Sequence, residues 1–469
     1  MEESEFEKRM KEIMNVLEYE VIKWEELPEA WKKENALLEL EQLLQKSWTE
    51  RTIFYWDEET ERNQKFIDFN RADGIKIQNY VGSLLFKGEQ LNIFPKLFQK
   101  ESPKERTKLE ASILMKNISF WLGYCDRMNI PFFSVRDSFF GKPNFLELLI
   151  AFYAKYTKGL VERQPYIQYE KKEEKGGFIR GKLLTEEYLL KQYPTGRWEQ
   201  IPYKYSEFTL DNPLNRMIKR TCQLLMVRTK EEESKKNLRA IIGKLAAVQL
   251  SADSKREWER IIIPIHQKPY QTVLTMSKFF LNSLGNTVES GKNESYCFLF
   301  PTELLFEHFV SGFLNSFLPA NVSIKTQTTD QYLADLWING QNIGKAFGLR
   351  EDIVIQTERN TIILDTKYKE IQPLNTPDQK RFGISEQDIR QIAIYAAKRK
   401  AKYVFLIYPL YWKEPSTSTE ITYQIQLQTE EPIQLEILKI PFLIEKNEEE
   451  TEQELKKQFQ KIYQNYLKK

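Results

Sequence analysis

The most regular pattern of apolar and polar positions lies in the C-terminal half of the chain. Residues 349–356 and 361–367 are rich in β-branched and aliphatic side chains, which is typical of short strands, and the polar residues between them are typical of a turn. Residues 385–397 place apolar side chains at helical spacing, and residues 402–408 form another apolar run. The pattern therefore predicts a β-hairpin, then a helix, then a further buried strand.

Two helix starts near this region carry recognisable capping signals. Ser385 is followed three residues later by Asp388, as in a capping box. A helix upstream is predicted to have Thr302 as its N-cap and Glu303 in its first turn, where a negative charge suits the helix dipole. These signals predict where the helices next to the hairpin begin.

The rest of the chain alternates between strand-like and helix-like segments. Strands are predicted within residues 74–97, 178–208, 420–428 and 433–441, and helices at 112–122, 145–154, 213–227, 229–285 and 448–469. Residues 169–177 are charged and end in glycine, and we interpret them as an exposed loop or hinge. Residues 286–294 are interpreted as a polar linker.

These elements predict an α/β fold with several parts. A chain of 469 residues has room for about three domains. The domain at residues 291–445 is expected to contain a mixed sheet flanked by helices. An α+β region at residues 71–290 precedes it, residues 1–70 form a segment that is helical in pattern, and residues 446–469 form a C-terminal helix.

Composition excludes several classes of protein. Lysine and arginine total 69 against 67 acidic residues, so the net charge is only +2 and any affinity for nucleic acid must come from local basic patches. With three cysteines and two histidines, neither a disulfide framework nor a zinc cluster is expected. Because no run of about 18 apolar residues occurs and the N-terminus is acidic, we expect a cytoplasmic protein that does not enter a membrane.

Two carboxylates and one ammonium group stand at the ends of the two predicted hairpin strands. Since side chains alternate along a strand, Asp365 and Lys367 lie on one face. Mg²⁺ prefers oxygen ligands, which Asp352, Asp365 and the backbone carbonyl of Thr366 are able to supply. Lys367 would then stabilise charge on the attacking water or the phosphate. An ordinary surface hairpin with an Asp–Lys pair has the same spacing, so the surroundings must decide.

The order hairpin, helix, strand resembles the core of PD-(D/E)xK nucleases. Asp352, Asp365 and Lys367 match its D-x12-D-x-K spacing, and Gln391 and Tyr395, which share a helical face, match the Q-x-x-x-Y signature of the RecB-like branch. Nucleases of this fold often add a metal-directed carboxylate from the first helix. The resemblance implies Glu307 for this role, and a solvated glutamate next to a surface histidine is the alternative.

Further segments extend the resemblance to the McrC family, the nuclease subunit of modification-dependent McrBC restriction systems. The matching segments are residues 77–82, 90–96, 205–212, 215–219, 297–310, 349–355 and 365–367. One departure is Glu351, where the family usually has proline before the first aspartate. Because proline is not a metal ligand, the departure does not affect the role of Asp352. Residues 1–70 match no family that we can name.

The McrC resemblance implies a function and a partner. It implies a Mg²⁺-dependent endonuclease that acts on modified, double-stranded DNA together with a GTP-hydrolysing AAA+ ring, McrB, which the N-terminal region binds and stimulates. The chain has no visible NTP site, because residues 285–293 have five residues between their glycines and asparagine where a P-loop has Ser or Thr. A RecB-like repair exonuclease and a catalytically silent activator of an AAA+ NTPase are the alternatives.

Basic residues on two segments flank the proposed site. Lys380 and Arg381 belong to the loop before the predicted helix, and the prolines and glycine of this loop allow an irregular path along a DNA backbone. Lys398 stands at the end of that helix, where a lysine also complements the helix dipole. We predict DNA contacts at all three residues, with the dipole role as the alternative for Lys398.

Overall fold

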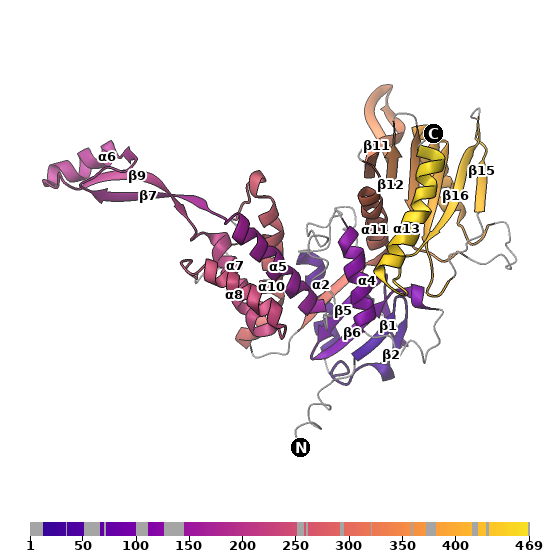
Figure 1. Ribbon diagram of the computed structural model, residues 1–469, viewed down its shortest axis with the longest axis horizontal. Helices are drawn as coiled ribbons and strands as arrows, with labels where there is room; N and C mark the ends of the chain where they lie inside the picture. Colours follow the sequence, from indigo (N-terminus) through magenta and orange to yellow (C-terminus); the bar gives the residue numbers. More distant parts are fainter. Residues whose placement is uncertain are drawn as a thin grey trace, which may run out of the picture. The chain divides into compact units, whose positions relative to one another are not determined.

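The chain forms two compact units, and the second is inserted in the sequence between the two segments of the first. The computed structural model describes residues 13–33, 35–50, 66–69, 72–99, 111–125, 145–250, 258, 261–290, 295–319, 321–357, 360–371, 381–414, 421–427 and 431–467 (Figure 1). Unit 1 combines Met1–Phe145 with Asn293–Lys469, and unit 2 is Leu146–Lys292. Within the described residues, no helix is both long enough and apolar enough to cross a membrane.

A four-stranded sheet forms the N-terminal part of unit 1, in the order β1-β6-β5-β10. β1 runs parallel to β6, and the other neighbouring strands are antiparallel. A three-stranded sheet, β2-β4-β3, shares its hydrophobic core. The described elements of this part are β1 Ile13–Leu17, β2 Val21–Lys23, η1 Trp24–Glu26, α2 Ala36–Glu50, β3 Ile67–Asp68, β4 Gly74–Ile77, β5 Tyr80–Phe86, β6 Glu89–Phe94, η3 Lys96–Phe98, α4 Ala111–Tyr124 and β10 Tyr296–Pro301.

Residues 1–70 contain strands, although their pattern predicted a helical segment. Among the described residues of this stretch, α2 is the one long helix, while β1, β2 and β3 are strands of two to five residues. Such short strands carry little periodic signal, and β1 is stabilised by pairing with the distant β6. Trp31 is buried and donates its indole N–H to the Phe86 carbonyl at 3.1 Å, which ties this segment to the core.

A six-stranded mixed sheet forms the C-terminal part of unit 1, in the order β11-β12-β13-β14-β16-β15. β12 and β13 form an antiparallel hairpin, α12 follows, and β14 returns parallel to β13, which confirms the predicted order of hairpin, helix and strand. The described elements are α11 Thr302–Phe317, β11 Ser323–Ile338, β12 Gln341–Gln356, β13 Thr361–Thr366, α12 Glu386–Arg399, β14 Tyr403–Pro409, β15 Ile421–Ile425, β16 Ile433–Ile440, α13 Glu448–Ile462 and η8 Tyr463–Leu467.

The two faces of this sheet pack against different elements. Ile392 and Tyr395 of α12 share a buried cluster with Ile363 of β13 and with β14. Phe405 of β14 alternates to the opposite face, where its ring lies 5.6 Å from that of Tyr466, which follows α13 in the sequence. The central strand β13 is therefore covered by side chains on both faces, which explains why its apolar run is nearly continuous.

Unit 2 combines a group of helices with a three-stranded sheet in the order β7-β9-β8. Its described elements are α5 Phe145–Arg163, β7 Gln168–Gly176, β8 Lys182–Leu183, α6 Thr185–Glu187, η5 Tyr188–Gln192, η6 Tyr193–Thr195, β9 Ile201–Thr209, α7 Pro213–Arg228, α8 Glu232–Lys244, η7 Ile265–Gln267 and α10 Pro269–Ser290. Because α10 extends to Ser290, the predicted linker at 286–294 is helical in its first part.

The interpretation of residues 169–177 as a loop or hinge is wrong. Nearly all of this segment belongs to strand β7, which pairs with β9 along its whole length. Opposite charges meet across the two strands, as in Lys172–Glu207 at 2.7 Å and Glu173–Lys204 at 2.6 Å. Cross-strand ion pairs of this kind stabilise two paired strands without alternating apolar residues. The sequence of β7 therefore lacks the alternation by which a strand is usually predicted.

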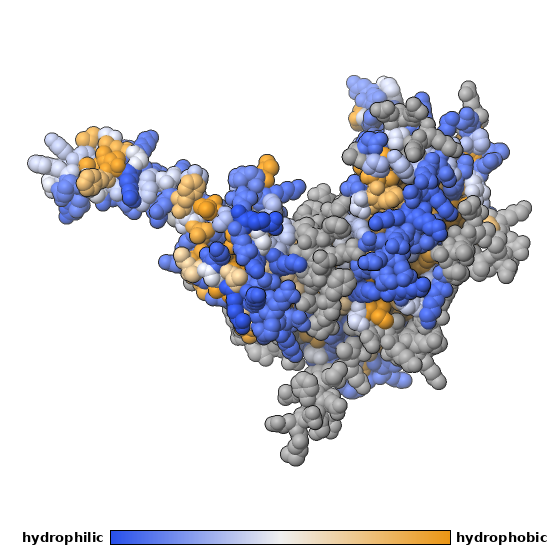
Figure 2. All heavy atoms as spheres, viewed as in Figure 1, coloured by the Kyte–Doolittle hydropathy of each residue, from blue (hydrophilic) through white to orange (hydrophobic). Residues whose placement is uncertain are grey.

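Apolar side chains lie exposed at the end of this sheet near α6. They include Phe178 at 89%, Leu190 at 70% and Trp198 at 63% exposure, and Figure 2 shows apolar residues gathered there among polar ones. Contiguous exposed apolar groups are typical of surfaces that contact a partner.

Glu351, which replaces the proline usual in the McrC pattern, forms a buried ion pair. It is fully buried in β12, and its Oε1 lies 2.8 Å from Nε of Arg399 at the C-terminal end of α12. Arg399 also pairs with Asp330 of β11. This network fixes the end of α12 against β11 and β12.

We predict that Glu351→Ala lowers the free energy of unfolding by about 3 kcal/mol, because it leaves the buried guanidinium of Arg399 without its principal partner. Guanidinium denaturation of the full chain measures the change. Glu386→Ala is the matched control, because it removes an exposed carboxylate from α12, the helix that carries Arg399. Its expected effect on the free energy of unfolding is within about 0.5 kcal/mol. Unfolding curves that coincide for wild type and Glu351→Ala would contradict the prediction.

Candidate active site

An aspartate and a lysine at the end of β13 form the centre of the site. Asp365 is 1% exposed, and the Nζ atom of Lys367 lies 2.5 Å from its Oδ2 atom. The backbone N–H of Lys367 donates to the Ile407 carbonyl at 2.8 Å, which continues the pairing of β13 with β14. The sheet therefore fixes the point from which the lysine side chain starts.

Asp352 of β12 completes the group of charges predicted from the sequence. Its Oδ2 atom accepts hydrogen bonds from the backbone N–H of Thr366 at 2.8 Å and from the Thr366 hydroxyl at 2.9 Å. Because Thr366 lies between Asp365 and Lys367, these bonds bring Asp352 to the same end of the hairpin. The structure thus brings both carboxylates and the ammonium group together.

Burial and repulsion make this site unfavourable for two ionised carboxylates. Burial, together with the charge of Asp352, raises the pKa of Asp365 to about 7. Burial also raises the pKa of Asp352, despite the hydrogen bonds from Thr366. For Lys367 burial acts against the charged form, but the carboxylates, Asp365 above all, raise its pKa and keep it protonated. Two carboxylates thus compete for one ammonium group, which favours a further cation.

Helix α12 contributes the two residues of the Q-x-x-x-Y pattern. Gln391 Oε1 accepts a hydrogen bond from Lys367 Nζ at 3.4 Å, and Gln391 Nε2 donates to the Tyr395 hydroxyl at 2.8 Å. Helical spacing of four residues places both side chains on the face that packs against β13. Tyr395 thus orients the amide of Gln391, and the amide in turn contacts the lysine.

The oxygen atoms of Asp365 suit a hard cation. Its Oδ1 atom is buried and has no hydrogen-bond partner within the described residues. Buried carboxylate oxygens normally have a partner, and an unused one is chemically suited to Mg²⁺, which binds through oxygen. The carboxylates of Asp352 and Asp365, with the Thr366 carbonyl beside them, fit such an ion.

Glu307, the predicted further ligand, contacts a glutamine. It lies in α11, is 9% exposed, and accepts a hydrogen bond from Gln327 Nε2 at 2.9 Å, while Gln327 accepts one from Arg350 at 2.8 Å. Across the described ranges, no three or more His, Cys, Asp or Glu side chains are placed together to hold a metal. The role of Glu307 as a further ligand therefore stays a prediction.

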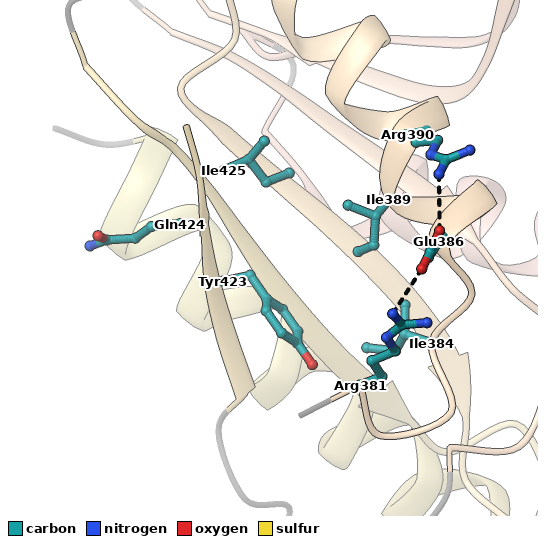
Figure 3. Close-up of a pocket in the computed structure, with 8 residues that line it drawn as sticks. All are labelled: Arg381, Ile384, Glu386, Ile389, Arg390, Tyr423, Gln424 and Ile425. Carbon is teal, nitrogen blue, oxygen red and sulfur yellow. Dashed lines mark hydrogen bonds and ion pairs between the residues drawn. The ribbon is translucent and has the colours of Figure 1, made fainter. Parts of the chain in front are cut away.

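The predicted DNA-binding residue Arg381 lies at a pocket between the start of α12 and strand β15. The pocket has a volume of about 390 Å³, and the apolar side chains Ile384, Ile389, Tyr423 and Ile425 line it (Figure 3). Arg381 and Arg390 each form an ion pair with Glu386, at 2.8 and 2.9 Å. A phosphate that binds these guanidinium groups must compete with the Glu386 carboxylate.

The other two predicted DNA contacts have different outcomes. Lys398 is exposed in the last turn of α12, as expected for either a phosphate contact or a dipole complement. Lys380 lies outside the described residues.

Asp388 is a charged neighbour of the site that was not predicted from the sequence. The sequence pattern placed Asp388 only in the capping box, and its backbone N–H does donate a hydrogen bond to the Ser385 Oγ atom at 3.1 Å. Its carboxylate is also buried, 3.1 Å from Lys369 Nζ and 4.0 Å from Lys367 Nζ. The available sequence signal was an acidic residue three positions before Gln391. Only the packing of α12 on β13 shows which lysines its carboxylate contacts.

The chain is similar to known proteins in sequence and in fold. The family model for the McrBC 5-methylcytosine restriction system component matches residues 75–409. No curated protein sequence matches the chain. Among solved structures, a refined half-complex from a tetradecameric assembly of Thermococcus gammatolerans McrB AAA+ hexamers with bound McrC has a TM-score of 0.63 at 17% identity, over 96% of this chain and 100% of that one. A cryo-EM structure of the Thermococcus gammatolerans McrBC complex has a TM-score of 0.46 at 19% identity, over 65% of this chain and 87% of that one.

We predict that Asp365→Asn raises the melting temperature of the metal-free protein more at about pH 8 than at about pH 5. Folded Asp365 has a pKa of about 7, whereas an unfolded aspartate ionises near pH 4. Between these values the folded state binds more protons, so wild type loses stability as the pH rises through this window. Asparagine stays neutral and escapes this loss. Thermal melts in a chelator measure the difference.

Asp335→Asn is the matched control, because Asp335 is an exposed aspartate of the same sheet. Its effect should not change between the two pH values. Added Mg²⁺ should raise the melting temperature of wild type and of Asp335→Asn, but not that of Asp365→Asn. A stability difference between wild type and Asp365→Asn that is the same at both pH values contradicts this account of the site.

Proposed function

This chain belongs to the family of McrBC 5-methylcytosine restriction system components, and we propose that it is the Mg²⁺-dependent DNA endonuclease subunit of such a system. In this proposal the six-stranded sheet and α12 form a PD-(D/E)xK nuclease domain. The domain cleaves phosphodiester bonds of modified double-stranded DNA when the chain is assembled with a GTP-hydrolysing AAA+ ring. The observation that carries the proposal is the buried convergence of Asp352, Asp365 and Lys367.

Asp352, Asp365 and the backbone carbonyl of Thr366 would hold the metal. When bound, Mg²⁺ supplies Lewis-acid polarisation of the phosphate and lowers the pKa of a bound water. The unpartnered Oδ1 atom of Asp365 and the repulsion between the two carboxylates both support a cation at this position. Glu307 is the proposed source of a further oxygen ligand.

Lys367 contributes a positive charge beside the reacting phosphate. Since the surrounding carboxylates keep it protonated, it is suited to stabilise negative charge and is unsuited to accept a proton. Gln391 accepts a hydrogen bond from its Nζ and is itself bonded to Tyr395. The two helix residues therefore orient the ammonium group, and the water or phosphate meets it in a fixed position.

The sequence printed for this chain contains no P-loop, and in this proposal a partner supplies the energy for movement along DNA. In the similar solved structure, McrB AAA+ hexamers carry bound McrC. We propose that this chain likewise binds an AAA+ ring and stimulates its GTP hydrolysis. The exposed apolar side chains of unit 2 near α6 support a partner surface there.

We predict that Asp365→Asn and Lys367→Met each reduce cleavage of supercoiled plasmid by the assembled complex by at least about 100-fold, because each removes a charge that acts on the reacting phosphate. Stimulation of GTP hydrolysis should be unchanged. Lys345→Ala, at an exposed lysine of β12, is the matched control and should cleave like wild type. Cleavage at the wild-type rate by either site variant refutes the assigned roles, and degradation only from linear ends indicates a repair-type exonuclease instead.

Arg381 is proposed to contact a DNA phosphate. Arg381→Ala should weaken binding of a duplex by a similar factor for every sequence and should lower the salt dependence of log Kd by about one, as expected for a lost phosphate contact. Glu386→Gln removes the carboxylate that competes for Arg381 and should strengthen binding. Fluorescence anisotropy over a range of salt concentrations measures both effects.

Lys398→Ala and Lys380→Ala should act in the same direction as Arg381→Ala. If Lys398 complements the helix dipole only, its loss leaves the affinity unchanged and lowers stability by about 0.3–1 kcal/mol. Lys456→Ala, on α13, is the control for the loss of a surface charge. An unchanged salt dependence for Arg381→Ala rules out its phosphate contact.

A further inference from the structure

A buried glutamate links the N-terminal sheet to the end of β13. Glu18 follows β1 and is 1% exposed. Its carboxylate accepts hydrogen bonds from the Thr302 hydroxyl at the start of α11, from the Lys96 backbone N–H at 3.0 Å and from the Tyr368 hydroxyl at 2.9 Å. Glu18 thus connects residues from distant parts of the sequence within unit 1.

Lys96 contacts Tyr368 at its backbone carbonyl, whereas Glu18 contacts its hydroxyl. Its Nζ atom donates to the Tyr368 carbonyl at 2.8 Å and lies 4.5 Å from the centre of the Tyr368 ring. The ring of Tyr19 lies 5.1 Å from the same Nζ atom. Tyr368 is only 4% exposed, so water competes little with these contacts. The hydroxyl and the carbonyl of Tyr368 are therefore both fixed by the N-terminal part of unit 1.

Tyr368 directly follows Lys367, so these contacts act on the backbone beside the candidate active site. The Lys369 N–H donates to the Lys367 carbonyl at 2.8 Å, which closes a tight turn with Tyr368 at its centre. Asp388 of α12 pairs with Lys369 at 3.1 Å. The turn is consequently held by α12 through Lys369 and by the N-terminal sheet through Tyr368.

We infer that Glu18 and Lys96 are positioning residues, which hold Tyr368 and through it the backbone of Lys367 where DNA cleavage requires the ammonium group. The inference rests on the proposed function. β13 ends at Thr366, so the placement of Lys367 depends on the turn that follows as well as on the ladder before it. A displacement of about 1 Å at a reacting centre is enough to cost about 100-fold in rate. The N-terminal segment that carries Glu18 is in this way part of the nuclease site.

The test removes one hydroxyl. Tyr368→Phe deletes the donor to Glu18 and keeps the ring that packs against Phe306 and Phe442. In the assembled complex, the single-turnover cleavage rate should fall by about tenfold or more, with DNA affinity and GTPase stimulation unchanged. Hydrogen exchange at the Lys367 and Lys369 amides should become faster, because the turn loses an anchor.

Tyr466→Phe is the matched control, because Tyr466 also donates its hydroxyl to a glutamate, Glu436, in unit 1. It should change neither the rate nor the exchange of the turn. Lys96→Met should act like Tyr368→Phe, and Lys96→Arg, which keeps a donor for the Tyr368 carbonyl, should recover most of the rate.

The outcomes separate positioning from plain stabilisation. Wild-type cleavage by Tyr368→Phe, or a loss that Tyr466→Phe reproduces in step with a lower melting temperature, overturns the inference. If the wild-type complex does not cleave DNA at all, the proposed function fails. In that case the exchange measurement alone decides: faster exchange at Lys367 in Tyr368→Phe supports the anchor, and unchanged exchange overturns it.

Discussion

The rest of this structure depends on one ion pair. It joins the Nζ atom of Lys367 to the Oδ2 atom of the buried Asp365, 2.5 Å away. Two charges removed from water are stable only when each compensates the other and their remaining hydrogen-bonding capacity is used. Here burial, and after it the charge of a second carboxylate, Asp352, raises the pKa of Asp365, so the compensation is incomplete. The site stores unfavourable electrostatic energy that a bound cation would relieve, which is the pattern expected of a functional site.

The fold holds these charges in place from several directions. β13 lies inside the sheet, between β12, which carries Asp352, and β14, which accepts a hydrogen bond from Lys367. Helix α12 is fixed at its start by the Ser385 cap and at its end by the buried pair of Arg399 with Glu351. Because both ends are fixed, the middle of the helix presents Gln391 to the lysine. Glu351, the residue that departs from the McrC pattern, thus supports the helix through its ion pair with Arg399.

Much of the site was predictable because its spacing follows local periodicity. Alternation along a strand placed Asp365 and Lys367 together, and helical spacing placed Gln391 beside Tyr395, and the structure shows both arrangements. Predictions were wrong where stability comes from distant partners. The charged strand β7 and the short strand β1 have weak signals of their own, and each forms because another strand lies alongside it.

Local order along the chain was therefore sufficient to establish the hairpin, the helix, the following strand and the main charged residues of the candidate site. Long-range packing alone determined that Glu18 and Lys96 meet Tyr368, that Asp388 meets Lys369, and that Glu307 turns to Gln327. The physical reason is that periodicity specifies which face of an element a side chain occupies. It does not specify which other element covers that face, and a buried polar group acquires its role from the partners it finds there.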